Sequence, residues 1–232
     1  MTTPDLSSDD FLRIDLTHKM ANGIPVWPGD PVFRQVEVFG FAKGDIACNH
    51  SLAFSEHSGT HFDAPLHFVP GGRTIDNVPV ERFFGRMVKI DARDALPMST
   101  LPPERILAFE AEHGAIEPGD AVMFNFGWDR YWRHPTESEK FARDWPGLSA
   151  AAAELLAERK VRLVATDCMS IDPFGSDDYP VHLVLLGRDI LIGENFTNLE
   201  KLPPVCQLVT LPLHVEGGSG APVRAVALIP KR

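Results

Sequence analysis

The chain concentrates three of its nine histidines and one aspartate in the stretch HSGTHFDAPLH, residues 57–67. The side chains of His57, His61, Asp63 and His67 are all ligands for transition metals. Catalytic zinc and related ions take three protein ligands of these types and leave one position open for water. Four such residues together predict a metal site, whereas one alone is more often a hydrogen-bonded histidine in a polar turn.

The spacing of these residues restricts the backbone that can bring them together. A helix would put His57 and His61 on one face but turn Asp63 away. Gly59 and Pro65 also disfavour a helix. In an extended chain the outer histidines would lie roughly 33 Å apart, at about 3.3 Å per residue, too far for one coordination sphere. We therefore expect a kinked loop leaving a strand, with unusual backbone angles at Gly59 and a fixed one at Pro65.

The composition indicates a soluble globular enzyme. A length of 232 residues permits one domain, and the net charge of −10 disfavours binding to nucleic acid or to anionic lipid. No apolar run approaches the roughly 20 residues that span a bilayer, and the polar first ten residues carry no signal-peptide pattern. We expect a small-molecule substrate, with neither nucleic acid nor a membrane as a partner.

The three cysteines, Cys48, Cys168 and Cys206, are isolated and lack CxxC spacing. The sequence therefore indicates neither a disulfide framework nor a thiolate zinc site. This usage fits a reducing cytoplasm, where we expect the protein to act.

The pattern of apolar residues predicts a flexible tail over residues 1–10 and a single domain over 11–232. Helices are expected at 102–114, at 148–160 with Ser149 as N-cap, and at 180–187. Runs rich in β-branched and aromatic residues predict strands at 11–17, 32–41, 86–92, 121–126 and 161–166. Helix–strand units in the later half predict an α/β fold with a mixed sheet, in which a β layer is added to an α/β core.

The stretch 57–67 also matches the pattern H-x-G-T/A-H-x-D-x-P-x-H, and similarity extends from PVWPGDP (25–31) to GGSGAPVRAVAL (217–228). The chain thereby resembles the metal-dependent cyclase family, which includes bacterial kynurenine formamidases and isatin hydrolases. The resemblance implies a swivelling β/β/α-type fold and a homodimer or higher homo-oligomer.

The resemblance to the formamidases also implies a ligand set. His57, His61 and Asp63 would bind a first zinc ion, Asp63 would bridge to a second, and His182 and Glu194 would complete that second site. Taken alone, His182 on an apolar helix is more often a core histidine, and Glu194 at a strand end is more often solvated. We expect two Zn²⁺ per chain, with Mn²⁺ as the alternative because imidazole and carboxylate ligands accept both.

The same resemblance assigns two further roles in the site. His67 corresponds to the catalytic acid/base, and an imidazole that titrates near neutrality suits proton transfer; a purely orienting role is the alternative. Trp27, on a proline-flanked turn, is expected to form a wall of the substrate pocket. The remaining aromatic residues near these segments are expected in the core: Phe33, Phe39, Phe41 and Phe54.

Polar residues elsewhere receive more modest interpretations. In TDCMSIDPF, Asp172 and its polar neighbours follow a strand, and we expect them to shape the site by hydrogen bonding. The Gly217–Gly220 segment is expected to be a plain turn, and Arg224 to pair with a surface acid.

These observations predict a metal-dependent hydrolase of amide bonds. The preferred substrate class is an aryl formamide, attacked by hydroxide formed at the metal, with His67 protonating the leaving nitrogen. The alternatives are hydrolysis of a cyclic amide, as in isatin hydrolases, a metal-dependent cyclase or lyase, and a protein in which zinc is only structural.

Overall fold

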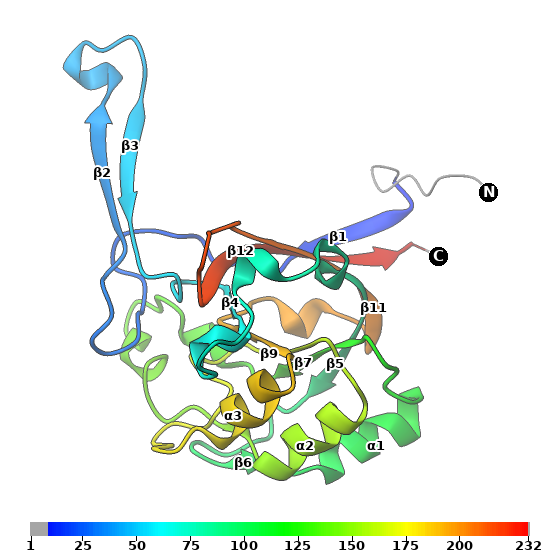
Figure 1. The fold of residues 1–232 in the computed structure, drawn as a ribbon. Helices are drawn as coiled ribbons and strands as arrows, with labels where there is room; N and C mark the ends of the chain where they lie inside the picture. Colours follow the sequence, from blue (N-terminus) through cyan, green and yellow to red (C-terminus); the bar gives the residue numbers. More distant parts are fainter. Residues whose placement is uncertain (1–8, 232) are drawn as a thin grey trace.

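In the computed structural model, which describes residues 9–231, the apolar runs of the sequence form one mixed sheet (Figure 1). Of the predicted tail, residues 1–10, only the last two lie within the described residues, as a turn before the first strand. The strands are β1 (Phe11–Asp15), β2 (Arg34–Phe39), β3 (Asn49–Ala53), β4 (His61–Asp63), β5 (Phe84–Asp91), β6 (Thr100–Leu101), β7 (Ala121–Asn125), β8 (Gly147–Leu148), β9 (Leu163–Thr166), β10 (Leu191–Glu194), β11 (Val205–Pro212) and β12 (Gly220–Pro230).

The main sheet closes on itself. Its order is β1-β12-β11-β5-β7-β9-β10-β4, and β12 also pairs with β4. The strands from β12 round to β4 therefore form a barrel, and β1 lies on the outer edge of β12. Strands β5, β7, β9 and β10 run parallel, and the remaining pairings in the ring are antiparallel. The predicted α/β fold with a mixed sheet is confirmed.

The parallel strands are buried on both faces, which explains their nearly continuous apolar sequences. In β7 every residue is buried, and successive side chains belong to two different cores. Ala121 and Met123 pack with residues of β11 and β12 inside the barrel. Val122 and Phe124 pack outward against the helices. A side chain on the outer face of a barrel strand therefore faces the helical layer.

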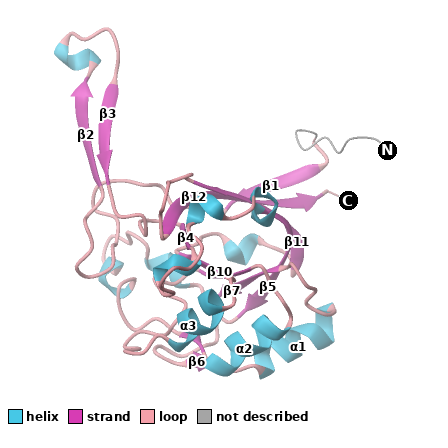
Figure 2. Ribbon diagram, in the orientation of Figure 1, coloured by secondary structure: helices cyan, strands magenta, loops and turns pink. Residues whose placement is uncertain are grey.

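Three helices cover that outer face: α1 (Glu104–His113), α2 (Ala150–Glu158) and α3 (Pro180–Gly187) (Figure 2). They confirm the three helices predicted from the sequence, with ends shifted by at most two residues. Ser149 caps α2 as predicted, because its side chain accepts a hydrogen bond from the Ala152 amide at 3.1 Å. No helix within residues 9–231 combines the length and the apolarity needed to cross a bilayer.

Strands β2 and β3 form a separate hairpin that extends away from the barrel (Figure 1). All residues of both strands are exposed. The prediction of a core position is wrong for Phe39 and Phe41, which are 49% and 70% exposed, because the hairpin leaves the body of the protein. Phe33 is buried and Phe54 stacks on it with ring centroids 5.8 Å apart, so the prediction holds at the base of the hairpin.

Candidate functional site

The site begins with the register of two short strands. His61 and Asp63 lie two residues apart on β4 and therefore point to the same side, the outer face of the barrel, whereas Phe62 between them is buried inside. β4 runs antiparallel to β10, with His61 directly opposite Glu194. Directly opposed residues share a face of the sheet, so the pairing adds Glu194 to the same group.

A chain reversal brings in His57. Gly59 has a φ of 65°, a left-handed angle that glycine adopts without strain, and the chain folds back there as the sequence predicted. His57 Nδ1 lies 2.7 Å from Asp63 Oδ1, and its Nε2 lies 2.9 Å from Ser219 Oγ. A Cβ on Gly220 would lie 2.6 Å from His57 Cε1, so only glycine leaves room for the imidazole at this point.

The first turn of α3 supplies His182. Asp172 accepts hydrogen bonds from the backbone amides of Val181 at 2.9 Å and His182 at 3.1 Å, and so caps the helix from a distant loop. The same carboxylate lies 2.6 Å from His182 Nδ1. This contact turns the other ring nitrogen, Nε2, toward Asp63 and Glu194. The prediction that Asp172 shapes the site by hydrogen bonding is confirmed.

The imidazole nitrogens converge on two carboxylates. His61 Nδ1 donates to the Gly59 carbonyl at 2.8 Å, and its Nε2 lies 3.3 Å from Asp63 and 3.5 Å from Glu194. His182 Nε2 lies 3.5 Å from both carboxylates. All five side chains assigned to metal by the resemblance therefore meet at one place, although they come from a loop, two strands and a helix.

The cluster is buried and negatively charged, which alters its titration. Burial alone would lower the pKa of His61, but the hydrogen bond to Asp63 and the charges of Asp63 and Glu194 raise it to about 9. Burial likewise opposes a charged His182, yet its contacts with Asp172, Asp63 and Glu194 raise its pKa well above the usual value. Burial would raise the pKa of Asp63, but its contacts with His182, His57 and His61 hold it well below its usual value. The carboxylates of Asp63 and Glu194 are therefore stabilised by nearby positive charge, either protons on the imidazoles or bound cations.

The arrangement fits a divalent cation. Asp63 Oδ2 is buried and makes no hydrogen bond, so a ligand oxygen is left unsatisfied in the middle of the cluster. Two groups have ligand atoms within 4.8 Å of one another: His57, Asp63 and His67, and His61, Asp63 and Glu194. Asp63 belongs to both, as a bridging carboxylate must. These groups differ from the sets that the resemblance implies, since His61 lies with Glu194 and His67 lies within reach of Asp63.

His67 lies at the mouth of the site, at the end of a short 3-10 helix that starts at Pro65. The residue is open to solvent, but its ring stacks on His57 with centroids 4.0 Å apart and meets Phe68 edge to face. Partial desolvation lowers the pKa of His67 to about 4, the Asp63 charge opposes this, and the nearby imidazoles add to it. This direction favours a neutral ring at pH 7, and the role of His67 as acid/base stays a prediction.

A pocket of about 320 Å³ opens above the cluster. His57, His61, His182 and Glu194 form part of its polar lining, and His67 borders it. An aromatic wall faces them. Tyr179 packs against both other members, and Trp27 also meets Trp145; the wall consists of Trp27, Phe68 and Tyr179. Trp27 thus lines the pocket as predicted, and its contact with a substrate stays a prediction.

Sequence reasoning missed three residues of the site. Ser219 contacts His57, and its backbone amide donates to Glu56 at 3.1 Å, so the Gly217–Gly220 turn is more than a connection. The side-chain amide of Asn195 donates to the Gly59 carbonyl at 2.9 Å, and the buried side-chain oxygen of Asn195, Oδ1, has no hydrogen-bond partner. Tyr179 lines the pocket just before α3. In the sequence, Ser219 was signalled only by the glycine-rich turn around it. Asn195 and Tyr179 were signalled only by their closeness to Glu194 and His182.

Two polar residues make their hydrogen bonds outside the cluster. Asp167 accepts hydrogen bonds from the amides of Phe126 at 2.9 Å and Trp128 at 2.8 Å, so it fixes a loop. Arg224 pairs with Asp15 at 2.7 Å on the surface, which confirms the surface interpretation.

Known proteins are similar to this chain in sequence and in fold. The model of the family described as Cyclase matches residues 14–173. A kynurenine formamidase of Salinibacter ruber is 32% identical over 92% of this chain and 95% of its own length. An isatin hydrolase of Roseibium aggregatum is 35% identical over 97% of this chain and 95% of its own. The structure of isatin hydrolase A from Labrenzia aggregata bound to benzyl benzoate superimposes with a TM-score of 0.88 at 30% identity, covering 97% of this chain and 96% of that one.

Proposed function

The chain belongs to the cyclase family, and we propose that it is a metal-dependent hydrolase of a carbon–nitrogen bond other than a peptide bond. The observation that carries the proposal is the buried group of His57, His61, Asp63, His182 and Glu194 at the base of a pocket with an aromatic wall. Relatives named for hydrolysis of a formamide and of a cyclic amide, each at 30% identity or more, support the same bond type.

The preferred substrate class is an aryl formamide. Trp27, Phe68 and Tyr179 offer flat apolar surfaces on which an aromatic ring can stack. A pocket of about 320 Å³ suits a substrate of one ring with a short side chain rather than a polymer. The substrate's amide carbonyl would then lie over the histidines and carboxylates.

His57, His61, Asp63, His182 and Glu194 would hold the metal, and we infer two ions because three imidazoles, those of His57, His61 and His182, all contact the one carboxylate of Asp63, which could bridge two ions. A bound divalent ion lowers the pKa of water and polarises a carbonyl oxygen. We prefer Zn²⁺ for these nitrogen and oxygen ligands, with Mn²⁺ as the alternative.

His67 is placed to move protons. Because its pKa is lowered to about 4, the ring is neutral at pH 7 and can accept a proton from the attacking water. The imidazolium so formed is a strong acid, and it would return the proton to the departing nitrogen, which is a poor leaving group without it. Trp27 would hold the ring of the substrate during both steps.

One alternative is supported by a specific observation. The isatin hydrolase of Roseibium aggregatum is 35% identical, which favours hydrolysis of a cyclic amide in the same pocket. Ring closure or elimination is the third candidate. Turnover in heavy-oxygen water separates these chemistries, because only hydrolysis must place solvent oxygen in the acid product.

The decisive experiment is elemental analysis of purified protein beside a screen of aryl formamides, isatin and other cyclic amides. His61→Ala should remove metal and turnover together, because Nε2 of His61 lies between the two carboxylates. An active, metal-free variant would refute the proposal. Glu194→Gln should reduce two ions per chain to one, and an unchanged count would mean that Glu194 holds no ion.

We further propose that the protein is a homodimer and that the β2–β3 hairpin joins its subunits. An isolated two-stranded hairpin is marginally stable in water, and this one exposes Val36, Phe39 and Phe41. Packing against a second copy would bury those side chains. Sedimentation of the wild type and of Phe41→Asp tests this, since an unchanged dimer in the variant would exclude an interface built on Phe41. Free thiols at all three cysteines agree with the cytoplasmic location that we expect.

A further inference from the structure

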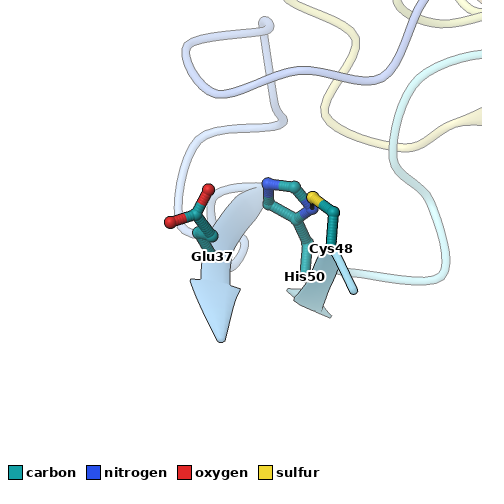
Figure 3. A group of neighbouring side chains, drawn as sticks. All are labelled: Glu37, Cys48 and His50. Carbon is teal, nitrogen blue, oxygen red and sulfur yellow. Dashed lines mark hydrogen bonds between the residues drawn. The ribbon is translucent and has the colours of Figure 1, made fainter. Parts of the chain in front are cut away.

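The hairpin carries a second group of metal-ligand side chains, well outside the pocket. Glu37 lies on β2, His50 lies on β3, and Cys48 lies just before β3 (Figure 3). All three are exposed. The sequence alone gave no sign of this group, because only Cys48 and His50 are close along the chain.

The strand register explains why the three side chains meet. Glu37 and His50 are directly opposite in the antiparallel pair, so both project from one face of the hairpin. Cys48 lies just before β3, and the contact of its Sγ with His50 Nδ1 puts it on the same face. Asn49, between them, points to the other face.

We propose that Glu37, Cys48 and His50 form a binding site for a thiolate-preferring divalent cation, with Zn²⁺ as the biological ion. Zinc is bound in proteins by combinations of Cys, His and Glu side chains in tetrahedral geometry. Three protein ligands leave a fourth position for water. This site does not depend on the function proposed for the pocket.

The distances suit capture of an ion after small side-chain movements. Cys48 Sγ lies 3.9 Å from His50 Nδ1, and the three ligand atoms all lie within 4.8 Å of one another. A tetrahedral zinc ion requires roughly 3.3–3.6 Å between such atoms. Because the side chains are exposed, rotation about their own bonds can close the difference. Lys43 Nζ lies 3.0 Å from Glu37 Oε1 and would have to release it.

An ion at this position would also stabilise the hairpin. It would link β2 to β3 by direct bonds, in an element that lacks a hydrophobic core of its own. Metal binding that requires a folded site contributes its free energy to the folding of that site.

Cobalt(II) is the probe that distinguishes this site from the pocket. A cobalt–thiolate bond gives an intense near-ultraviolet charge-transfer band, whereas imidazole and carboxylate ligands do not. Cys168 and Cys206 are buried, at 0% and 5% exposure, so Cys48 is the accessible thiol of the chain. Titration of the full-length protein with Co²⁺, in a phosphine reductant, should produce the band with the amplitude of one thiolate-bound cobalt ion per chain, whatever number of ions the pocket takes up, and Zn²⁺ should displace it.

Single substitutions test each ligand. Cys48→Ser should abolish the band, and His50→Ala and Glu37→Gln should each weaken Co²⁺ binding at this site by at least about tenfold. Lys43→Ala should strengthen binding, because it removes the competing ammonium group. The matched control is Asn49→Ala, on the opposite face, which should retain the band at wild-type affinity.

Absence of the band in the wild type would overturn the proposal. Equal affinity in the His50→Ala or Glu37→Gln variant would overturn it too, because the cysteine would then be binding cobalt without these partners. Loss of the band in Asn49→Ala would likewise overturn the assignment of the ligands. Cobalt binding would then depend on the hairpin as a whole and not on the three side chains of one face.

Discussion

Replacing Asp172 by asparagine tests the mechanism by which the fold aims His182 at the cluster. The Asp172 carboxylate accepts from the amide of Val181 at 2.9 Å, from the amide of His182 at 3.1 Å, and from His182 Nδ1 at 2.6 Å. An asparagine has one accepting oxygen, and its amino group can only donate. If that group takes the place of Oδ2, it meets two donors of His182, and the ring must move or place its proton on Nε2.

A proton on Nε2 removes the nitrogen that faces Asp63 and Glu194. Loss of such an orienting partner lowers metal affinity by about 10- to 100-fold, or roughly 1.4–2.7 kcal/mol. If the asparagine oxygen instead stays on His182, the amide of Val181 loses its cap, which costs about 0.5–2 kcal/mol of stability. We expect metal affinity to fall in either case, because an amide oxygen is a weaker acceptor for the Nδ1 proton than the carboxylate that lies 2.6 Å from it.

The assay is competition for Zn²⁺ between the protein and a chromophoric chelator, with urea unfolding of the metal-free protein measured in parallel. Asp167→Asn is the matched control, because Asp167 is equally buried and accepts two backbone hydrogen bonds from residues that are not ligands, Phe126 and Trp128. That variant should keep wild-type metal affinity. Zinc affinity within twofold of wild type in a folded Asp172→Asn protein would refute the orienting role.

Three further predictions concern the backbone, the pH response and the pocket wall. Gly59→Ala should destabilise the protein by about 1–3 kcal/mol in urea unfolding, because φ is 65° and the new Cβ would lie 2.4 Å from Met20 Sδ; an unchanged midpoint would contradict it. His18 stacks on Trp132 at 4.1 Å, and burial lowers its pKa to about 4 although the charge of Asp129 opposes this. The stability that the neutral ring contributes above its pKa in the unfolded chain is therefore lost as the pH falls toward its pKa in the folded protein. Between about pH 7.5 and about pH 5 this loss is about 2 kcal/mol, and it should be missing in His18→Phe; an equal loss in both proteins would exclude His18 as its source. Trp27→Ala should raise KM for an aryl substrate by about tenfold or more with little effect on metal content, and an unchanged KM would remove Trp27 from the binding site.

The sequence predicted the elements of the fold better than their assembly. The amphipathic runs at 150–158 and 180–187 and the apolar strands were recognisable because local periodicity reports burial. Barrel closure was not, because β4 has only three residues and owes its place to pairing with β10 on one side and β12 on the other. The positions of Phe39 and Phe41 were predicted wrongly because the apolar residues of the hairpin have the pattern of a buried strand, and the sequence does not show that the hairpin leaves the barrel.

The candidate site shows the same division. A local pattern and a resemblance indicated His57, His61, Asp63 and His67, and they do lie together. The partners that aim these side chains, such as Asp172 and Ser219, act through contacts that no spacing along the chain reveals.

The position of the ligands on the seam of the barrel links cation binding to the fold. β4 closes the ring, and its outer face carries His61 opposite Glu194 of β10 and Asp63 two residues further along, so two buried carboxylates lie across the closing strand pair. Without a cation, their charge is balanced by protons on His61 and His182, which explains the raised pKa values of both rings. A bound divalent cation would replace those protons and would link the two strands and α3 through their side chains. The weakest closure of the barrel, a strand of three residues, is therefore the place where a metal ion would add the most.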